Sequence, residues 1–155
     1  MPFLKRFIKL MKSELVSKEK KYNSWIIDES KCLNAEEVRR LRSFCNRAKN
    51  YGLQHRKFVP VRNWFMVELG LNAGLRVEEM TSLRCGDLLI DKDRSSMLVT
   101  GKGNKKRAVW INSGFKKTCQ RYIAHKKDFS YYTSAEDYLL NNLKGSKITK
   151  RALQK

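Results

Sequence analysis

The chain has 155 residues, 41% of them hydrophobic, which is enough for one ordinary domain with a buried core. Lysine and arginine number 34 against 15 aspartates and glutamates, so the net charge is +19 at pH 7. A field of that sign favours a polyanion, because each neutralised phosphate releases condensed counterions, so nucleic acid is the first partner to consider; a solvated basic surface and a membrane-associated one remain alternatives.

Cysteine spacing and hydropathy argue against several other classes. The four cysteines, at positions 32, 45, 85 and 119, form no CxxC pair, and neither histidine lies at ligand spacing. We therefore expect no disulfide framework, no metal and no other cofactor, in a reducing cytoplasm. No run of residues approaches the roughly 20 apolar residues of a membrane span.

Residues 1–22 predict a basic amphipathic helix. Its apolar residues recur at helical spacing, and lysines and arginines occupy most of the remaining positions. Such a helix can contact a DNA backbone, lie on a membrane or dock a partner, or it can simply pack its apolar side on the domain. A lysine-rich linker follows, which divides the chain into residues 1–30, a helix with its linker, and a domain at residues 31–155.

Two longer helices open that domain. Asn34 and Glu37 match a capping box, so a helix is expected from there to about Asn50, ended by Asn50-Tyr51-Gly52. The next helix, Phe58–Ala73, is apolar on nearly every side, which predicts a central position. Gly74 can close it in the left-handed conformation.

A short helix and a small sheet come next. Val77–Leu83 fits the helix, and Leu88–Ile90, Ser96–Thr100 and Ala108–Ile111 fit strands. Gly101–Asn104 provides a tight connection between the last two strands. The predicted fold class is therefore α+β, mainly helical with a three-stranded antiparallel sheet.

Three further helices are predicted in the C-terminal part. Ser113 is expected to cap the first, with Phe115, Cys119, Tyr122 and Ile123 on its apolar side. Its other side is expected to carry Lys116, Lys117, Arg121, Lys126 and Lys127. Ser134 to Asp137 resembles a capping box for a second helix, and a third is expected to begin at Ile148.

Two basic features stand out as candidates for phosphate chemistry. Arg76 follows a glycine turn at the end of the apolar helix, which suits bidentate contact with a phosphate; the alternative is an ion pair with Glu78 or Glu79. Lys102 lies between two glycines on a hairpin connection, where it can reach into a groove or simply face solvent.

Taken in order, these motifs resemble the first half of the catalytic domain of the tyrosine recombinase (phage integrase) family. The matching segments are GLRVEE at 74–79, LRCGD at 83–87 and GKGNK at 101–105. The resemblance covers roughly residues 30–155. It implies a partial catalytic domain of the integrase type, truncated at the C-terminus.

The resemblance also implies residue roles. Arg76 matches the arginine that grips the scissile phosphate, Glu79 an acidic residue that orients it, and Lys102 a general acid that protonates the departing 5'-hydroxyl. The residues expected to contact DNA are Arg84, Lys105, Lys106 and Arg107. The family's His-x-x-Arg motif and tyrosine nucleophile have no match here, and Tyr131, Tyr132 and Tyr138 are not assigned to that role.

The predicted function is site-specific DNA recombination by strand breakage and rejoining, in which this chain binds double-stranded DNA and supplies phosphate contacts but is inactive alone. We expect self-association on DNA, a prokaryotic, phage or mobile-element origin, and no membrane or small-molecule partner. The alternatives are a non-catalytic DNA-binding module derived from a truncated recombinase and, with less support from the motifs, a basic RNA-binding protein.

Overall fold

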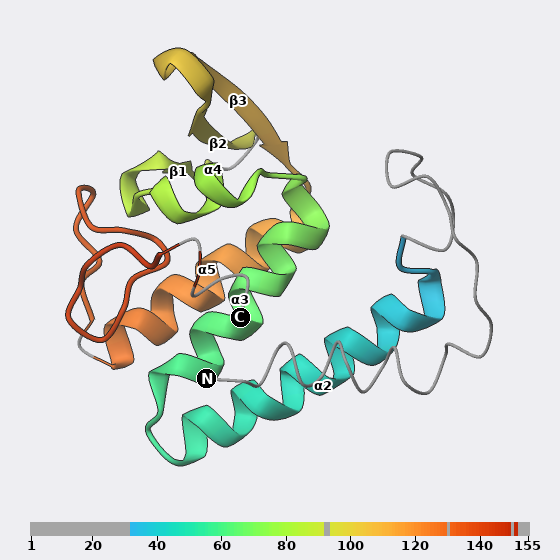
Figure 1. Cartoon of the computed structure of the whole chain (residues 1–155). Helices are drawn as coiled ribbons and strands as arrows, with labels where there is room; N and C mark the ends of the chain where they lie inside the picture. Colours follow the sequence, from blue (N-terminus) through green and yellow to red (C-terminus); the bar gives the residue numbers. More distant parts are fainter. Residues whose placement is uncertain (1–31, 92–93, 130, 150, 152–155) are drawn as a thin grey trace.

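A computed structural model describes residues 32–91, 94–129, 131–149 and 151. Three long helices form one layer and a small sheet with a short helix forms the other (Figure 1). In chain order the elements are α2 (Ala35–Gln54), α3 (Phe58–Ala73), α4 (Val77–Ser82), a 3-10 turn (Cys85–Asp87), β1 (Leu88–Leu89), β2 (Ser95–Thr100), a second 3-10 turn (Lys102–Asn104), β3 (Lys106–Ile111) and α5 (Ser113–Asp128). The predicted fold class is confirmed.

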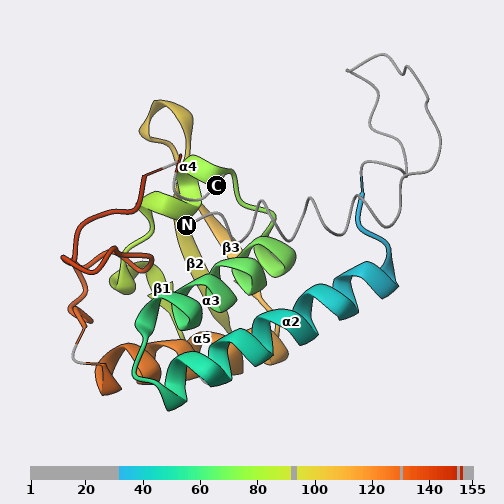
Figure 2. The ribbon, with the colours of Figure 1, turned by 60° about the horizontal axis from the view of Figure 1, so that its bottom comes forward.

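Helix α3 is the centre of the core, as its all-round apolar sequence predicts. It packs against both α2 and α5 (Figure 2). Phe65 is fully buried, and its ring stacks on Tyr122 of α5 with centroids 3.9 Å apart. Gly74 ends α3 with a φ of 57°, the left-handed conformation that glycine adopts without steric cost. The helix therefore ends in a fixed turn.

Helix α2 begins as predicted but ends later. The Asn34 side chain accepts from the Glu37 amide at 2.9 Å, and the Glu37 carboxylate accepts from the Asn34 amide at 2.8 Å, so the capping box is confirmed. The helix continues to Gln54, and the predicted end near Asn50 is wrong. Gly52 lies inside α2, where the absence of a side chain lets the start of α3 approach closely.

The sheet is an antiparallel meander in the order β1-β2-β3, as predicted. Met97 and Val99 point into the core and are fully buried, because alternate residues of a strand face the same side. The β2–β3 connection, Gly101 to Lys105, projects from the body beside α4 (Figure 2). Gly103 in this connection has a φ of 72°.

The N-cap of helix α5 lies one residue earlier than predicted. Asn112, not Ser113, is the N-cap, and its side chain accepts from the Phe115 amide at 2.8 Å. Ser113 is the first helical residue. Lys126, expected on the solvent side, has no exposed surface, and its ammonium group donates to the Tyr138 carbonyl at 2.8 Å. Positions 115, 119, 122 and 126 form one stripe, so the fourth member follows the apolar three into the core.

The helix predicted from Ser134 is wrong. The Asp137 carboxylate accepts from the Ser134 amide at 2.7 Å, but the chain makes a turn there and then runs beside residues 83–86. The Cys85 amide donates to the Asp137 carbonyl at 2.8 Å, and the Leu139 amide donates to the Leu83 carbonyl at 2.8 Å. These bonds pair backbone groups that a helix would otherwise pair within itself. The fully buried Leu139 side chain packs in the core in addition.

Two predicted helices lie wholly or largely outside the described residues. The basic helix of residues 1–22 and the linker up to residue 30 are among them. Of the helix expected from Ile148, Ile148 and Thr149 are not helical, Arg151 is helical, and the remaining positions are outside the described ranges. Among the helices that the structure describes, none has the length and hydropathy to cross a membrane.

Gly52→Ala is expected to lower the free energy of unfolding by about 1–3 kcal/mol, the range for overpacking. A Cβ at position 52 would lie 2.7 Å from the Lys57 carbonyl oxygen, a backbone atom that cannot move aside cheaply. Gly70→Ala in the exposed part of α3, where the nearest atom is Met80 Cε at 3.9 Å, is the matched control and should gain about 0.5–1 kcal/mol. Urea titration of both variants tests this; equal effects would contradict the packing argument.

Candidate phosphate-binding site

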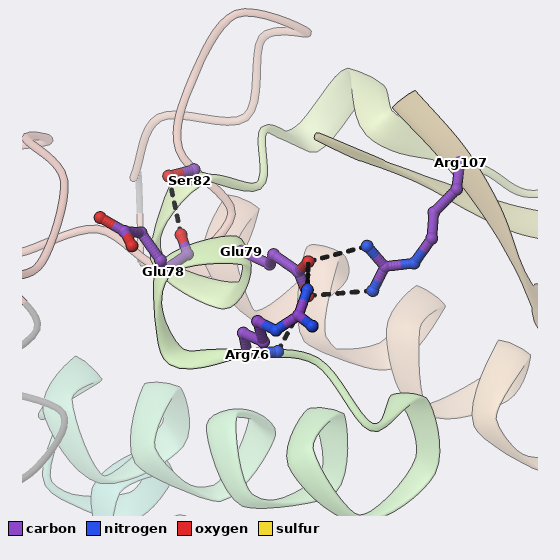
Figure 3. Close-up of polar contacts among 5 residues, drawn as sticks. All are labelled: Arg76, Glu78, Glu79, Ser82 and Arg107. Atoms are coloured by element: carbon purple, nitrogen blue, oxygen red, sulfur yellow. Dashed lines mark hydrogen bonds and ion pairs between the residues drawn. The ribbon is translucent and has the colours of Figure 1, made fainter. Parts of the chain in front are cut away.

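The turn after α3 places Arg76 at the start of α4. Arg76 is the N-cap residue, and its backbone amide donates to Glu79 Oε2 at 2.9 Å (Figure 3). The carboxylate three residues into the helix therefore satisfies an amide that has no partner within the helix. The same arrangement recurs at Arg84, whose amide donates to Asp87 Oδ2 at 2.7 Å. In both Leu-Arg-x-x-acid segments of the sequence, the acidic side chain therefore accepts from the backbone amide of the arginine.

Arg107 on β3 is the main side-chain partner of Glu79. Its Nη1 and Nη2 lie 2.7 Å and 3.0 Å from the two carboxylate oxygens, which is the paired geometry that a guanidinium and a carboxylate favour (Figure 3). The Glu79 side chain is only 4% exposed, and that of Arg107 is 45% exposed. The pair therefore ties α4 to the sheet at the edge of the core.

Arg76 makes a looser contact with the same carboxylate. Its Nη1 lies 3.5 Å from Glu79 Oε1, and its side chain is 79% exposed. Of the two ion pairs considered from the sequence, the one with Glu79 is formed, at the long end of hydrogen-bond range. Glu79 thus holds Arg76 mainly through its backbone and leaves most of the guanidinium facing solvent.

The hydrogen bonds from Arg107 and from the Arg76 amide lower the pKa of Glu79 to about 2. The carboxylate is therefore charged at neutral pH although its side chain is buried. In return, the hydrogen bond to Glu79 raises the pKa of the Arg107 guanidinium. A buried charge of this kind persists only where donors surround it, as they do here.

The hairpin that carries Lys102 begins against this cluster. A Cβ built on Gly101 would lie 3.4 Å from Glu79 Oε1 and 3.5 Å from Arg107 Nη1, which is van der Waals contact, so position 101 lies directly beside both side chains. The Gly101 amide donates to the Lys105 carbonyl at 2.8 Å and closes the turn. Lys102, Lys105 and Lys106 are all exposed. Arg76, Glu79, Arg107 and the base of the hairpin are therefore brought together, with the lysines beside them.

Arg84 is directed elsewhere. Its guanidinium donates to the Glu136 carbonyl, lies 3.3 Å from Glu136 Oε2, and faces the Tyr138 ring at 5.1 Å. These contacts hold the segment after α5 against the 3-10 turn. Arg84 has no contact with the Glu79 cluster among the interactions of the described residues, so the two Leu-Arg segments share a backbone design and differ in what the arginine side chain touches.

The described residues contain no group of three histidine, cysteine or acidic side chains that could hold a metal. The cluster consists of one buried carboxylate and two guanidinium groups, with lysines on the adjoining hairpin. Such an arrangement has donors directed outward and can bind the non-bridging oxygens of a phosphate.

The sequence predicts Arg76, Glu79 and Lys102 as site residues but does not predict Arg107 as the main partner of Glu79. The sequence predicts Arg107 as a DNA contact together with Lys105 and Lys106, and the structure adds its paired hydrogen bonds to Glu79. The available signal was alternation along β3, because Val109 and Ile111 face the core and position 107 shares their side.

The chain is similar in sequence to a known protein family and to several of its members. The family model described as "Phage integrase family" matches residues 31–155. A tyrosine recombinase XerC from Staphylococcus saprophyticus is 34% identical over 94 residues, which cover 61% of this chain and 30% of that protein. A XerC from Staphylococcus epidermidis is 30% identical over 103 residues, which cover 66% and 33%. The chain thus spans about a third of the length of the curated relatives it matches.

Solved structures show the same fold. The XerH site-specific recombinase bound to palindromic difH substrate in a post-cleavage complex superposes with a TM-score of 0.59 and 25% identity, over 77% of this chain and 32% of that one. XerA recombinase superposes with a TM-score of 0.60 and 17% identity, over 96% and 48%, a likeness of fold alone.

Glu79→Gln is expected to lower the free energy of unfolding by about 1–3 kcal/mol at neutral pH, the range for hydrogen bonds to charged groups. Because the pKa of Glu79 is lowered when folded, its stabilisation is complete above the unfolded value near 4.5 and is lost as pH falls toward about 2. The gap between wild type and variant should therefore be constant above about pH 5 and close by pH 2. Urea titrations across this range measure it; a gap independent of pH would contradict the assignment.

Proposed function

Because the chain belongs to the phage integrase family, we propose that it binds double-stranded DNA and forms part of the phosphate-activating site of a site-specific recombinase. The observation that carries the proposal is the cluster in which one buried carboxylate, Glu79, holds the Arg76 backbone and the Arg107 guanidinium beside the base of the lysine hairpin. This is an anion-binding surface that folding itself orients.

Arg76 is proposed to grip the scissile phosphate. Its backbone is held at the helix start by Glu79, and its guanidinium is 79% exposed, so the planar donors are available to two non-bridging oxygens. As a nucleophile attacks phosphorus, negative charge increases on those oxygens. A fixed guanidinium stabilises that charge more than the ground state and so lowers the barrier.

Lys102 is proposed to act as the general acid. In the reaction that the family membership implies, a tyrosine oxygen attacks phosphorus, a 3'-phosphotyrosyl bond forms, and the bond to the 5'-oxygen breaks. The departing oxygen needs a proton, and a lysine ammonium at the tip of an exposed turn can approach it from the groove. Return of a 5'-hydroxyl reverses these steps and rejoins the strand.

The surrounding basic residues are proposed to bind the DNA backbone. Lys105 and Lys106 are exposed and lie three and four residues after Lys102, and the net charge of +19 attracts duplex DNA over long range. Arg107 and Arg84 already have intramolecular partners, so their proposed DNA contacts use the donors that those partners leave over. Self-association on DNA and a cytoplasmic location form part of the same proposal.

We assign no nucleophile among the tyrosines of the second half of the chain. Tyr131 stacks on Phe58 with centroids 4.3 Å apart, and Tyr138 lies under the Arg84 guanidinium. Tyr122 is fully buried, its hydroxyl donates to the Leu139 carbonyl at 3.0 Å, and burial raises its pKa. These contacts support structural roles for Tyr122, Tyr131 and Tyr138. Tyr132 is exposed and is not assigned as the nucleophile either, so the chain alone is proposed to bind DNA without cutting it.

Arg76→Ala should weaken binding to a duplex by roughly 10- to 100-fold at low salt, because about 1.5–3 kcal/mol accompanies a hydrogen bond to a charged group. Arg76→Lys should recover only part of the loss, since a lysine cannot form the paired contact. Lys144→Ala, an exposed lysine outside the site, is the matched control and should bind like wild type. Gel-shift titration at several salt concentrations tests this; equal losses for Arg76→Ala and Lys144→Ala would contradict a specific phosphate contact.

The chain alone should form no covalent adduct with DNA. A nicked suicide duplex traps any 3'-phosphotyrosyl bond, because the freed 5' end diffuses away and cannot reverse the reaction. We expect retention of the duplex in a native gel and no adduct after denaturation. An adduct that persists through denaturation and disappears when a single tyrosine is changed to phenylalanine would identify a nucleophile in this chain and overturn the proposed division of roles.

A further inference from the structure

An apolar groove of about 910 Å³ lies between the C-terminal half of α2 and the N-terminal half of α3. Pockets that enclose small ligands occupy roughly 300–1,000 Å³, so this groove has room for several side chains. Cys45, Phe58 and Trp64 form buried parts of its wall. Tyr51 and Leu143 flank it and are 48% and 61% exposed. None of the residues that line it belongs to the Glu79 cluster.

The charged residues that line the groove are all positive. Arg47, Arg56 and Lys57 line it and are exposed, and no lining residue is acidic. Arg56 donates to the Asp128 carbonyl at 3.3 Å, and Lys57 donates to the Tyr51 hydroxyl at 3.3 Å. Within the described part of the chain, none of these three cations is paired with a carboxylate. The surface therefore fits a segment that has large apolar side chains next to carboxylates.

We propose that this groove binds the chain's own segment Trp25–Glu29, which precedes the described residues. The segment reads Trp-Ile-Ile-Asp-Glu, three large apolar residues followed directly by two carboxylates. Its apolar side chains match the walls, and Asp28 and Glu29 match the cationic rim. The apolar stripe of residues 1–22 matches less well, because lysines and arginines flank it and the rim would repel them.

The chain is long enough for this contact. Ala48, midway along the groove, is 13 residues beyond the first residue of α2 at Ala35, about 20 Å along a helix that rises about 1.5 Å per residue. Ile27 precedes Ala35 by eight residues, and an extended chain of that length spans up to about 27 Å at 3.3–3.6 Å per residue. The segment can therefore fold back along α2 and reach the groove.

Docking would hold the basic residues 1–22 beside the α2 and α3 surface, and it would cover the apolar walls of the groove. Large exposed apolar patches on a soluble domain are usually covered by a partner or by another part of the chain. The inference does not depend on the proposed recombinase function, since no residue of the Glu79 cluster takes part.

The test uses the full chain labelled with 5-fluorotryptophan at its three tryptophans, Trp25, Trp64 and Trp110. The Trp25 fluorine resonance is assigned from Trp25→Phe and compared with that of a labelled peptide of residues 22–31. Docking predicts a Trp25 resonance shifted from the peptide position and independent of protein concentration. Ala48→Glu, which places a carboxylate in the groove, should return it to the peptide position. Lys57→Glu on the rim should do the same.

Asn50→Glu is the matched control, because it adds the same charge to an exposed position of α2 that does not line the groove. It should leave the shift in place. Far-UV circular dichroism checks that each variant is folded, and Lys57→Glu, at an exposed position, provides the decisive comparison if Ala48→Glu is not. A Trp25 resonance at the peptide position in the unmodified chain would overturn the proposal. So would a shift that persists in both groove variants, or one that disappears on dilution, which would assign the groove to a second copy.

Discussion

The organisation of the site depends on one buried carboxylate. Glu79 accepts the backbone amide of Arg76, the paired donors of Arg107 and a long contact from the Arg76 guanidinium. A charge in that position would be costly without these donors, so the buried carboxylate depends on both arginines. The same atoms hold the start of α4, the third strand and the base of the hairpin in a fixed relation. A single acid thereby positions residues that are 31 positions apart in the sequence, from Arg76 to Arg107.

The core beneath this carboxylate provides the rigid support that it needs. Helix α3 is buried between α2 and α5, and the stacked rings of Phe65 and Tyr122 join it to α5. Gly74 then turns the chain directly from that helix to Arg76. Because the turn begins at the end of a packed helix, the packing of the core fixes the position of the Arg76 backbone. An anion-binding group gains from such preorganisation, since its backbone needs no ordering when the phosphate arrives.

Beside the 3-10 turn at Cys85–Asp87, a buried lysine has a structural role like that of Glu79, because it too is a buried charge that joins distant segments. Lys126 donates to the Tyr138 carbonyl, and Tyr122 donates to the Leu139 carbonyl, so α5 supplies the partners of a segment that has no regular structure of its own. Arg84 completes the attachment through Glu136. Two charged residues in Leu-Arg segments therefore have different tasks: Arg76 faces solvent near the hairpin, and Arg84 secures the chain after α5.

The sequence by itself determined the features that depend on local chemistry: the capping box at Asn34, the apolar α3 closed by Gly74, the alternating strands, and Arg76 and Lys102 as candidates in order. It could not determine which side chain lies opposite Glu79, because that pairing joins α4 to β3 and depends on the register of the sheet. Tertiary packing also overrode local signals. Gly52 does not end α2, because α3 packs against it. Ser134 starts no helix, because residues 135–139 form backbone hydrogen bonds with residues 83–86. Lys126 is buried because its ammonium group donates to a backbone carbonyl there. Local sequence predicts elements, and contacts between distant residues decide where those elements end and what their charged groups bind.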